Sequence, residues 1–262
     1  MPSPHALVRP VSTSLAACEL SFREREGIDL ERAEGQHGAY AAALEAAGYS
    51  VRWLPALPDQ PDAVFVEDPI VVLDEVAIVG RPGAASREGE VESVAAAVAP
   101  FRPLLHLPGE ARLEGGDAMR VGRTLYVGRS ARTNAAAHAA LADLLAPFGY
   151  AVVPVAMTGC LHLKTGVTYV CRTGEAEAGC FLANPEWIDA AGLSGAPVVP
   201  VPATEPWAAN TLTAGEHVFL PAGFPRTLDL LAARGHRVEA IDVSELQKAE
   251  GSVTCLSVIF EE

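Results

Sequence analysis

The most reactive side chains of this sequence fall into four short segments that are far apart along the chain. The segments are Phe65–Asp68 with two acids, Leu113–Asp117 with two acids around two glycines, Leu161–Lys164 with a histidine, and Gly251–Ser257 with a cysteine. A thiolate can act as a nucleophile, an imidazole can transfer protons, and carboxylates can hold a cation. Together these groups predict covalent chemistry on a guanidinium-like group.

The two acidic segments predict different local structures. The glycine pair between Glu114 and Asp117 predicts a tight turn, because glycine tolerates backbone conformations that other residues avoid, and the flanking acids could converge on one point. Residues 62–66 are mostly apolar and predict a strand, after which Glu67 and Asp68 would point to opposite faces. One acid would then meet a ligand and the other the protein, although solvated turns are the alternative for both segments.

The histidine and the cysteine each have a structural and a chemical interpretation. His162 lies between two leucines, so strand-like alternation would turn it to the face opposite both. It could protonate a leaving nitrogen and later activate water, with Glu114 orienting its ring. Cys255 precedes an apolar terminal strand, where it would be held and still reachable. A packed structural cysteine is the alternative, and it suits Cys171 and Cys180 better, since both lie within apolar segments.

A weak internal repeat must position these groups. An apolar strand followed by a Gly, Ala or Pro break recurs at residues 76–81, 124–129, 179–184 and 217–221. Three of these strands lead into helical patterns, at residues 86–99, 134–145 and 225–233, and then into strands at 104–107, 151–155 and 238–241. A strand at 7–9, a helix at 35–47 and a strand at 51–54 form one more unit.

The repeated unit is strand, strand, helix, strand. It recurs roughly every 40 to 55 residues, a period typical of propellers and other repeat folds. About five copies fit into the chain, which predicts an α/β ring that forms a single domain over residues 1–262. A doubly wound parallel sheet is the structural alternative.

The composition limits the classes of partner. The 262 residues are half apolar and one fifth charged, as in soluble globular proteins. A net charge of −14 disfavours nucleic-acid binding and favours approach of a cationic small molecule. No apolar run approaches the roughly 20 residues that span a bilayer, and the N-terminus lacks a signal-peptide pattern, so we expect no membrane partner and a cytoplasmic location. Five cysteines without zinc-type spacing predict reduced thiols and no metal site.

Six ordered motifs resemble the guanidine-modifying pentein superfamily, and within it the dimethylarginine dimethylaminohydrolase (dimethylargininase) family. The resemblance runs from about Leu7 to Phe260, and its motifs are Phe65–Asp68, Arg81–Glu90, Leu113–Asp117, Ser130–Asn134, Leu161–Lys164 and Gln247–Ser257. It implies a five-bladed α/β propeller of ββαβ units around a central substrate pocket. It also implies a hydrolase that converts N-omega-methylated arginine to citrulline and an amine, without a metal or organic cofactor.

The resemblance also implies a role for each site residue. Cys255 would be the nucleophile that forms an S-alkylthiouronium intermediate, His162 the general acid and base, and Glu114 its orienting partner. Asp68 would bind the guanidinium group, with Glu67 beside it. The implied contacts with the amino-acid end of the substrate are Arg87 and Arg132 at its carboxylate, and Asp62, Leu20 and the backbone of Ala249 around it. A homodimer is a further expectation.

Lys164 bears on the choice among relatives. Arginine deiminases and amidinotransferases typically carry an acid two places after the histidine, whereas this chain has Lys164 there. Losing that second acceptor is tolerable when one guanidinium nitrogen bears methyl groups. The sequence therefore favours methylated arginine, and a hydrolase for free arginine or another guanidine compound is the alternative. A pentein-shaped binding or translation-factor-like protein without catalysis would need no nucleophile.

Overall fold

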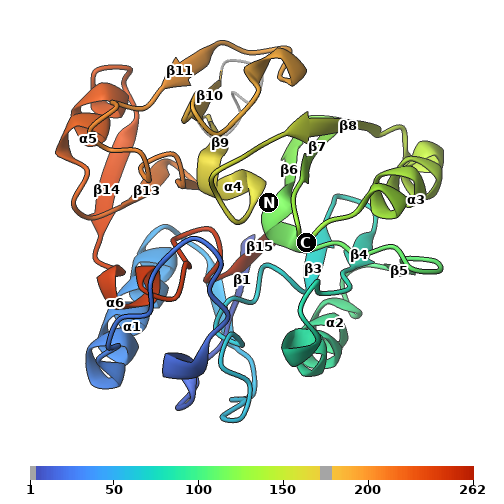
Figure 1. Ribbon diagram of the computed structural model, residues 1–262, viewed down its shortest axis with the longest axis horizontal. Helices are drawn as coiled ribbons and strands as arrows, with labels where there is room; N and C mark the ends of the chain where they lie inside the picture. Colours follow the sequence, from blue (N-terminus) through green and yellow to red (C-terminus); the bar gives the residue numbers. More distant parts are fainter. Residues whose placement is uncertain (1–3, 172–178) are drawn as a thin grey trace.

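Five three-stranded sheets surround a central axis in the computed structural model, which describes residues 4–171 and 179–262 (Figure 1). With the strand nearest the axis given first, the sheets are β15 (Val258–Glu261), β1 (Pro4–Val8) and β2 (Ser50–Trp53); β3 (Ile70–Val72), β4 (Ala77–Val79) and β5 (Leu104–His106); β6 (Ala118–Val121), β7 (Thr124–Arg129) and β8 (Ala151–Ala156); β9 (Val167–Val170), β10 (Cys180–Ala183) and β11 (Val198–Pro200); and β12 (Leu212–Ala214), β13 (His217–Pro221) and β14 (Arg237–Ile241).

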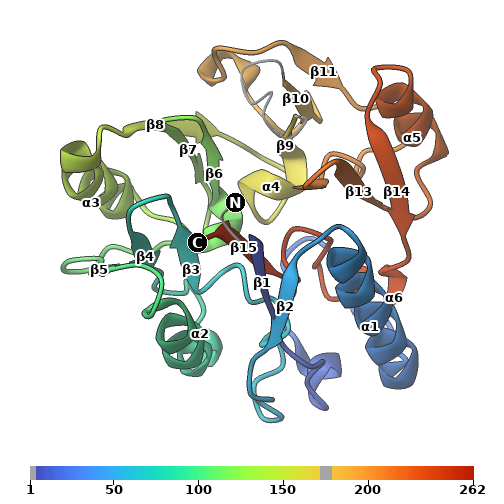
Figure 2. The same ribbon diagram turned by 180° about the vertical axis from the view of Figure 1, so that it is seen from behind.

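Every sheet has the same strand directions. The inner and middle strands are antiparallel, and the middle and outer strands are parallel. A parallel pair needs a crossover connection, for which a helix is the usual solution. The crossovers contain the helices α1 (Leu30–Ala46), α2 (Val91–Val98), α3 (Ala135–Leu145) and α5 (Pro225–Ala232) and, in the fourth sheet, the 3₁₀-helix η6 (Ala190–Gly192). The four α-helices lie at the outside of the ring in both views (Figures 1 and 2).

This architecture confirms the predicted five-bladed α/β propeller of ββαβ units. The strands expected at 124–129 and 217–221 have those limits. The first helix begins at Leu30, five residues before its predicted start at residue 35. Asp29 caps it by accepting a hydrogen bond from the Arg32 amide. The helix expected over 86–99 begins as the 3₁₀-helix η2 (Ala85–Glu90) and becomes α-helical at Val91.

The ring is closed by its two ends. The late strand β15 pairs with the early strand β1, so that Pro4 lies opposite Glu261. The inner strands of all five sheets line a central cavity of about 490 Å³. No helix within residues 4–171 and 179–262 combines the length and the apolar character that crossing a membrane requires.

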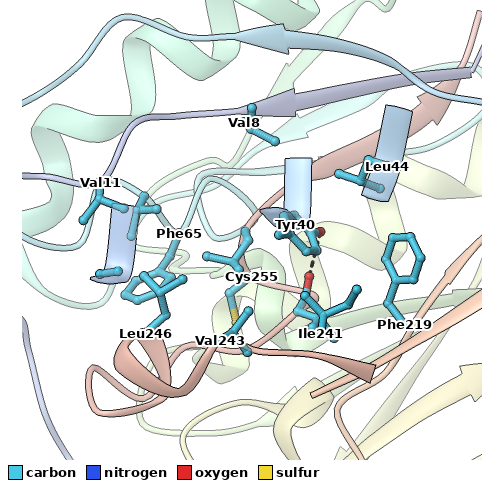
Figure 3. Packing of buried hydrophobic residues seen from close by; sticks show 14 of the residues in the cluster. Val8, Val11, Tyr40, Leu44, Phe65, Phe219, Ile241, Val243, Leu246 and Cys255 are labelled. Atoms are coloured by element: carbon cyan, nitrogen blue, oxygen red, sulfur yellow. Dashed lines mark hydrogen bonds between the residues drawn. The ribbon is translucent and has the colours of Figure 1, made fainter. Parts of the chain in front are cut away.

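The largest buried cluster lies between the first and fifth sheets and extends to the end of the chain. It includes Tyr40 of α1, Phe65, Phe219 and Cys255, which Figure 3 shows at close range. The Tyr40 hydroxyl donates a hydrogen bond to the carbonyl oxygen of Val253 at 2.8 Å. The apolar core therefore continues directly into the segment that carries the cysteine.

Candidate active site

A small cavity, separate from the one lined by the inner strands, brings together seven of the ten predicted site residues. Its volume is about 20 Å³. It is lined by the predicted residues Asp62, Asp68, Arg87, Arg132, His162, Ala249 and Cys255, and also by Glu19, Phe65, Leu161, Glu250 and Gly251. The other three predicted residues lie elsewhere: Glu114 lies behind His162, Glu67 lines the larger central cavity, and Leu20 packs against the core cluster.

A short polar contact joins His162 to Glu114. The Nε2 atom of His162 lies 2.6 Å from Oε2 of Glu114, and both side chains are buried. Glu114 also accepts a hydrogen bond from the Gly83 amide at 2.8 Å and from the Arg132 guanidinium at 3.3 Å. Burial would raise the pKa of Glu114, but the hydrogen bond and charge of His162 hold it well below its usual range. Glu114 is therefore an anion.

The protonation of His162 is opposite to that of most buried histidines. Burial would lower the pKa of His162, but the negative charge of Asp68 and the hydrogen bond to Glu114 raise it to about 9. The Nδ1 atom of His162 lies 3.8 Å from Oδ1 of Asp68. At neutral pH the imidazole is therefore a cation that can donate a proton.

The backbone around His162 accounts for the glycine pair of Leu113–Asp117. A Cβ atom on Gly116 would lie 2.7 Å from Nδ1 of His162, and one on Gly115 would lie 2.1 Å from the carbonyl oxygen of Glu67. Both positions consequently need glycine. The pair forms the 3₁₀-helix η3 (Gly115–Asp117) rather than only a turn between converging acids.

His162 is not on a strand, which corrects the alternation argument. It has extended backbone angles and precedes the short helix α4 (Leu163–Gly166). The first amide of that helix, from Leu163, donates a hydrogen bond to Oδ1 of Asp117 at 2.9 Å. Asp117 thus fixes the histidine's own segment. The sequence contained this residue in a motif, but gave no signal that it contacts a distant helix.

Asp68 binds a guanidinium group, and in this structure the group belongs to Arg87. Oδ2 of Asp68 lies 2.6 Å from Nη1 of Arg87, and Oε2 of Glu90 lies 2.8 Å from Nη2. The amide of Gly116 donates to the other Asp68 oxygen at 3.1 Å. Burial would lower the pKa of Arg87, but Asp68 and Glu90 hold it well above its usual value. Glu90 was not predicted, although its spacing of three residues from Arg87 on η2 is a recognisable signal.

Cys255 lies in a turn immediately before β15, rather than at the start of a strand. Its amide donates to the carbonyl oxygen of Ser252 at 3.0 Å, and its carbonyl oxygen accepts from the Glu67 amide at 3.3 Å. Burial raises the pKa of the thiol to about 12, and the negative charges of Glu67 and Asp68 add to the rise. The free thiol therefore needs an added positive charge nearby before it ionises at neutral pH.

Glu67 and Asp68 have different partners, as expected, but not because they point to opposite faces of a strand. Residues 62–68 form successive turns, with the Phe65 amide donating to the Asp62 carbonyl oxygen at 2.9 Å. Glu67 pairs with Lys164 at 2.5 Å, and both line the central cavity. Burial raises the pKa of Glu67 to about 7, although Lys164 opposes the rise. Lys164 is therefore the partner of a buried acid.

The small cavity is also lined by residues of loops whose structure the sequence patterns did not predict. The Asp62 carboxylate accepts a hydrogen bond from the Glu19 amide at 3.1 Å, and the Glu19 carboxylate accepts one from Ser86 at 2.6 Å. Ala249 is buried at the end of α6 (Ser244–Gln247), and Glu250 follows it. Glu19 and Glu250 were missed because acids in loops are ordinarily solvated.

Among residues 4–171 and 179–262, one group of side chains has the spacing of metal ligands. An oxygen or nitrogen atom from each of Asp68, Glu114 and His162 lies within 4.8 Å of the others. These atoms already contact one another, and Arg87 and Arg132 compensate the carboxylate charges. The group therefore has a complete explanation as a network of ion pairs.

Comparison with known proteins identifies the family. The chain is 39% identical over 238 residues to N(G),N(G)-dimethylarginine dimethylaminohydrolase of Pseudomonas aeruginosa, covering 88% of this chain and 90% of the relative. It is also 39% identical over 263 residues to the protein of the same name from Streptomyces coelicolor, covering 100% and 99%. No protein-family model matches the chain.

A solved structure gives the same result. The Pseudomonas aeruginosa enzyme, as a cysteine-to-serine mutant complexed with citrulline, superposes with a TM-score of 0.89 at 33% identity, covering 99% of this chain and 100% of that one. The chain is thus closely similar to these enzymes over nearly its whole length. It contains the five-bladed ring, the buried pair of His162 and Glu114, and the thiol. The chain belongs to the dimethylarginine dimethylaminohydrolase family.

Proposed function

We propose that this chain hydrolyses N-omega-methylated arginine, both asymmetric dimethylarginine and monomethylarginine, to citrulline and dimethylamine or methylamine. The names of the two bacterial relatives and the citrulline in the solved structure support this activity. The observation that carries the proposal is the convergence of Cys255, a cationic His162 and Asp68 on one small cavity. Such a cavity offers a nucleophile, a proton donor and a binding site for a cationic group.

The first step is the activation of the thiol. The guanidinium group of the substrate binds at Asp68, and its positive charge offsets the negative field that raises the pKa of Cys255. The thiol releases its proton to solvent, because the imidazole of His162 is already protonated, and the thiolate attacks the guanidinium carbon. A C–S bond forms and gives a tetrahedral adduct.

The adduct collapses with the help of His162. The C–N bond to the methylated nitrogen breaks as the imidazolium donates its proton to the departing amine. An S-alkylthiouronium intermediate remains on Cys255. The now neutral imidazole removes a proton from a water molecule, which attacks the same carbon, and the C–S bond breaks to release citrulline. Glu114 keeps the ring oriented and stabilises its cationic form throughout.

The amino-acid end of the substrate would extend to the other side of the cavity. Arg132 is the more accessible of the two arginines proposed for the substrate carboxylate, because Arg87 is held by Asp68 and Glu90. Arg87 would have to share its guanidinium with the substrate. The amino group would be surrounded by Asp62, Leu20 and the backbone of Ala249. Glu67 would lie beside the site and influence it through its negative charge. These steps require no metal or organic cofactor.

Three further properties belong to the same proposal. Residues 1–262 would act as one catalytic domain, since the five sheets form a single ring. A cytoplasmic location is supported by five cysteines that are all free. A homodimer is supported by the outer strand β2, where Trp53 is exposed at the sheet edge, and sedimentation analysis of the purified protein would test it.

A citrulline assay tests the function. Purified protein is incubated in parallel with asymmetric dimethylarginine, monomethylarginine and free arginine. The variants are Cys255→Ser and, as a matched control, Cys171→Ser, which changes a cysteine outside the small cavity. We expect citrulline from the methylated substrates, no citrulline with Cys255→Ser, and normal turnover with the control. Turnover of free arginine in preference to the methylated substrates would refute the proposed substrate class.

A further inference from the structure

Asn210 joins the segment of the histidine to the segment of the cysteine. It is buried and lies two residues before β12. Its Nδ2 atom donates a hydrogen bond to the carbonyl oxygen of Lys164, in the helix that follows His162, at 3.0 Å. Nδ2 also donates to the hydroxyl of Thr254, next to Cys255, at 3.0 Å, and Oδ1 accepts from the Thr254 amide at 3.2 Å. Both hydrogens of the side-chain amide are therefore used in linking the two segments.

These partners leave Asn210 a single orientation. Exchanging its amide nitrogen and oxygen would place two donors against each other at the Thr254 amide and two acceptors against each other at the Lys164 carbonyl. The backbone is fixed as well, by the hydroxyl of Thr168 in β9. This hydroxyl donates to the carbonyl oxygen of the residue before Asn210 at 2.7 Å and accepts from the amide of the residue after it at 3.3 Å. Asn210 is thus a rigidly held donor to Thr254.

The donor at Asn210 decides where the hydroxyl hydrogen of Thr254 points. A hydroxyl has one hydrogen, and since its oxygen accepts from Asn210, that hydrogen is available to another acceptor. The sulfur of Cys255 lies 3.8 Å from the hydroxyl oxygen. Glu67 is a second acceptor near the hydroxyl, but it already binds Lys164. Burial raises the pKa of the Cys255 thiol, and the hydrogen bond from Thr254 opposes that rise.

Thr254 contacts the nucleophile without sharing its cavity. It lines the central cavity, whereas Cys255 lines the small cavity in which the substrate is proposed to bind. A hydrogen bond to an ionised acceptor is stronger than one to a neutral acceptor, so a hydroxyl in this position stabilises the thiolate more than the thiol. Such a donor is valuable here, because Glu67 and Asp68 both oppose ionisation of Cys255.

We propose that Thr254 donates a hydrogen bond to the thiolate of Cys255, and that Asn210 is the positioning residue that directs the hydroxyl towards the sulfur. The hydroxyl keeps its hydrogen throughout, so it stabilises the charge and transfers no proton. Through the Lys164 carbonyl, Asn210 also holds the cysteine segment against the histidine segment. The proposal rests on the proposed function for the reaction, but the reactivity of the thiol can be measured without any substrate.

Substitutions of nearly equal shape separate the hydroxyl from the rest of the side chain. Thr254→Val removes the hydroxyl, Thr254→Ser retains it, and Asn210→Ala removes the group that directs it. Thr227→Val is the matched control, because it deletes a buried hydroxyl that donates to Glu205 and lines neither cavity. The first measurement is the rate at which iodoacetamide alkylates Cys255 at pH 8, followed by mass spectrometry of its peptide. The second is the kcat and KM for asymmetric dimethylarginine.

We expect alkylation of Cys255 to be about fivefold slower in Thr254→Val. Loss of a charge-assisted hydrogen bond lowers the thiolate fraction roughly thirtyfold, and the greater nucleophilicity of the more basic thiolate recovers about half of this on a logarithmic scale. Asn210→Ala should slow alkylation to a similar extent, and the double variant should be no slower than Thr254→Val, because both act through one hydrogen bond. Thr254→Ser and Thr227→Val should stay within about twofold of the parent rate.

Turnover should separate this role from substrate binding. In Thr254→Val we expect kcat to fall about fivefold and KM to change by less than about twofold, because Thr254 contacts the nucleophile and not the substrate. Alkylation at or above the parent rate in Thr254→Val would overturn the proposal, since the hydroxyl would then serve Glu67. Slower alkylation with an unchanged kcat would also overturn it.

Two further outcomes distinguish the parts of the argument. A double variant slowed by the product of the two single effects would overturn the role of Asn210, because the two residues would then act independently. If the parent protein turns over no methylarginine, but alkylation is slower in Thr254→Val and normal in Thr254→Ser, the hydrogen bond to the thiolate is supported and the proposed function is refuted instead.

Discussion

The pair of His162 and Glu114 makes folding stability depend on pH in a way that can be calculated. The pKa of His162 is about 9 in the folded protein and 6.5 in its reference state. Because the folded-state pKa is raised, the folded protein binds more protons between these values, and the free energy of unfolding falls as pH rises from 6.5 to 9. At about 1.4 kcal/mol per unit, the full difference corresponds to about 3 kcal/mol.

Replacing Glu114 by glutamine removes one source of this shift. Glu114→Gln keeps a hydrogen-bonding side chain at 2.6 Å from the imidazole and deletes the charge, while Asp68 remains at 3.8 Å. We therefore expect roughly half of the pH-dependent stabilisation, about 1 to 2 kcal/mol, to disappear. The charge is also lost beside Arg87 and Arg132, but arginines do not titrate in this range, so that loss is a constant offset at every pH.

Urea unfolding at pH 6, 7, 8 and 9 measures the effect. The difference in free energy of unfolding between the parent and Glu114→Gln should be largest at pH 6 and should shrink steadily towards pH 9. Glu34→Gln, at an exposed site, should show no such trend. A parent-minus-variant difference that is the same at all four pH values would refute the assignment of a cationic, Glu114-bound imidazole.

Three further predictions concern neighbouring residues. The rate at which iodoacetamide alkylates Cys255, followed by mass spectrometry of its peptide, should rise continuously from pH 7 to pH 10, because the pKa of the thiol is about 12. A plateau below pH 9 would contradict this. Lys164→Met should destabilise the protein by about 3 kcal/mol in urea unfolding, because it leaves Glu67 buried without its partner. Adding Glu67→Gln should recover most of the loss, and a double variant no more stable than the single one would contradict this. Tyr40→Phe should cost about 1 to 2 kcal/mol, measured in the same way, since the Val253 carbonyl oxygen loses its buried donor, and an unchanged midpoint would argue against that bond.

Local patterns predicted the middle and outer strands better than the inner ones. The strand β7 was predicted with its observed limits because it has six residues and begins after a turn that contains Gly122. The inner strands β3 and β12 have three residues each and, unlike the equally short β4, do not lead into a helix that would mark the repeat. Their position is set by pairing within the ring rather than by their own residues. The repeat, and with it the ring, could nevertheless be deduced from the longer strands and their helices.

The structure brings the predicted site residues together most closely where chemistry restricts the residue type. Cysteine, histidine and the acid beside a glycine pair are uncommon combinations, and Cys255 and His162 both line the cavity, with Glu114 in contact with His162. Placement failed where it relied on assumed strands, because residues 62–68 turn repeatedly and direct Glu67 into the central cavity. The contacts of Glu250 could not be foreseen, because its carboxylate binds backbone amides of residues 21–23, more than two hundred residues away in the chain.

The closure of the ring by β15 and β1 also has a consequence for biosynthesis. A ribosome makes the first sheet's middle and outer strands early, but their inner partner is made last. Pairing at such sequence separation is slow, and a nascent chain must wait with an open edge. Cys255 lies three residues before the start of β15 and is the last of the residues lining the small cavity to be synthesised. Because Pro4 lies opposite Glu261, a circular permutant that joins them through a short linker and opens the chain elsewhere would reverse this order of assembly.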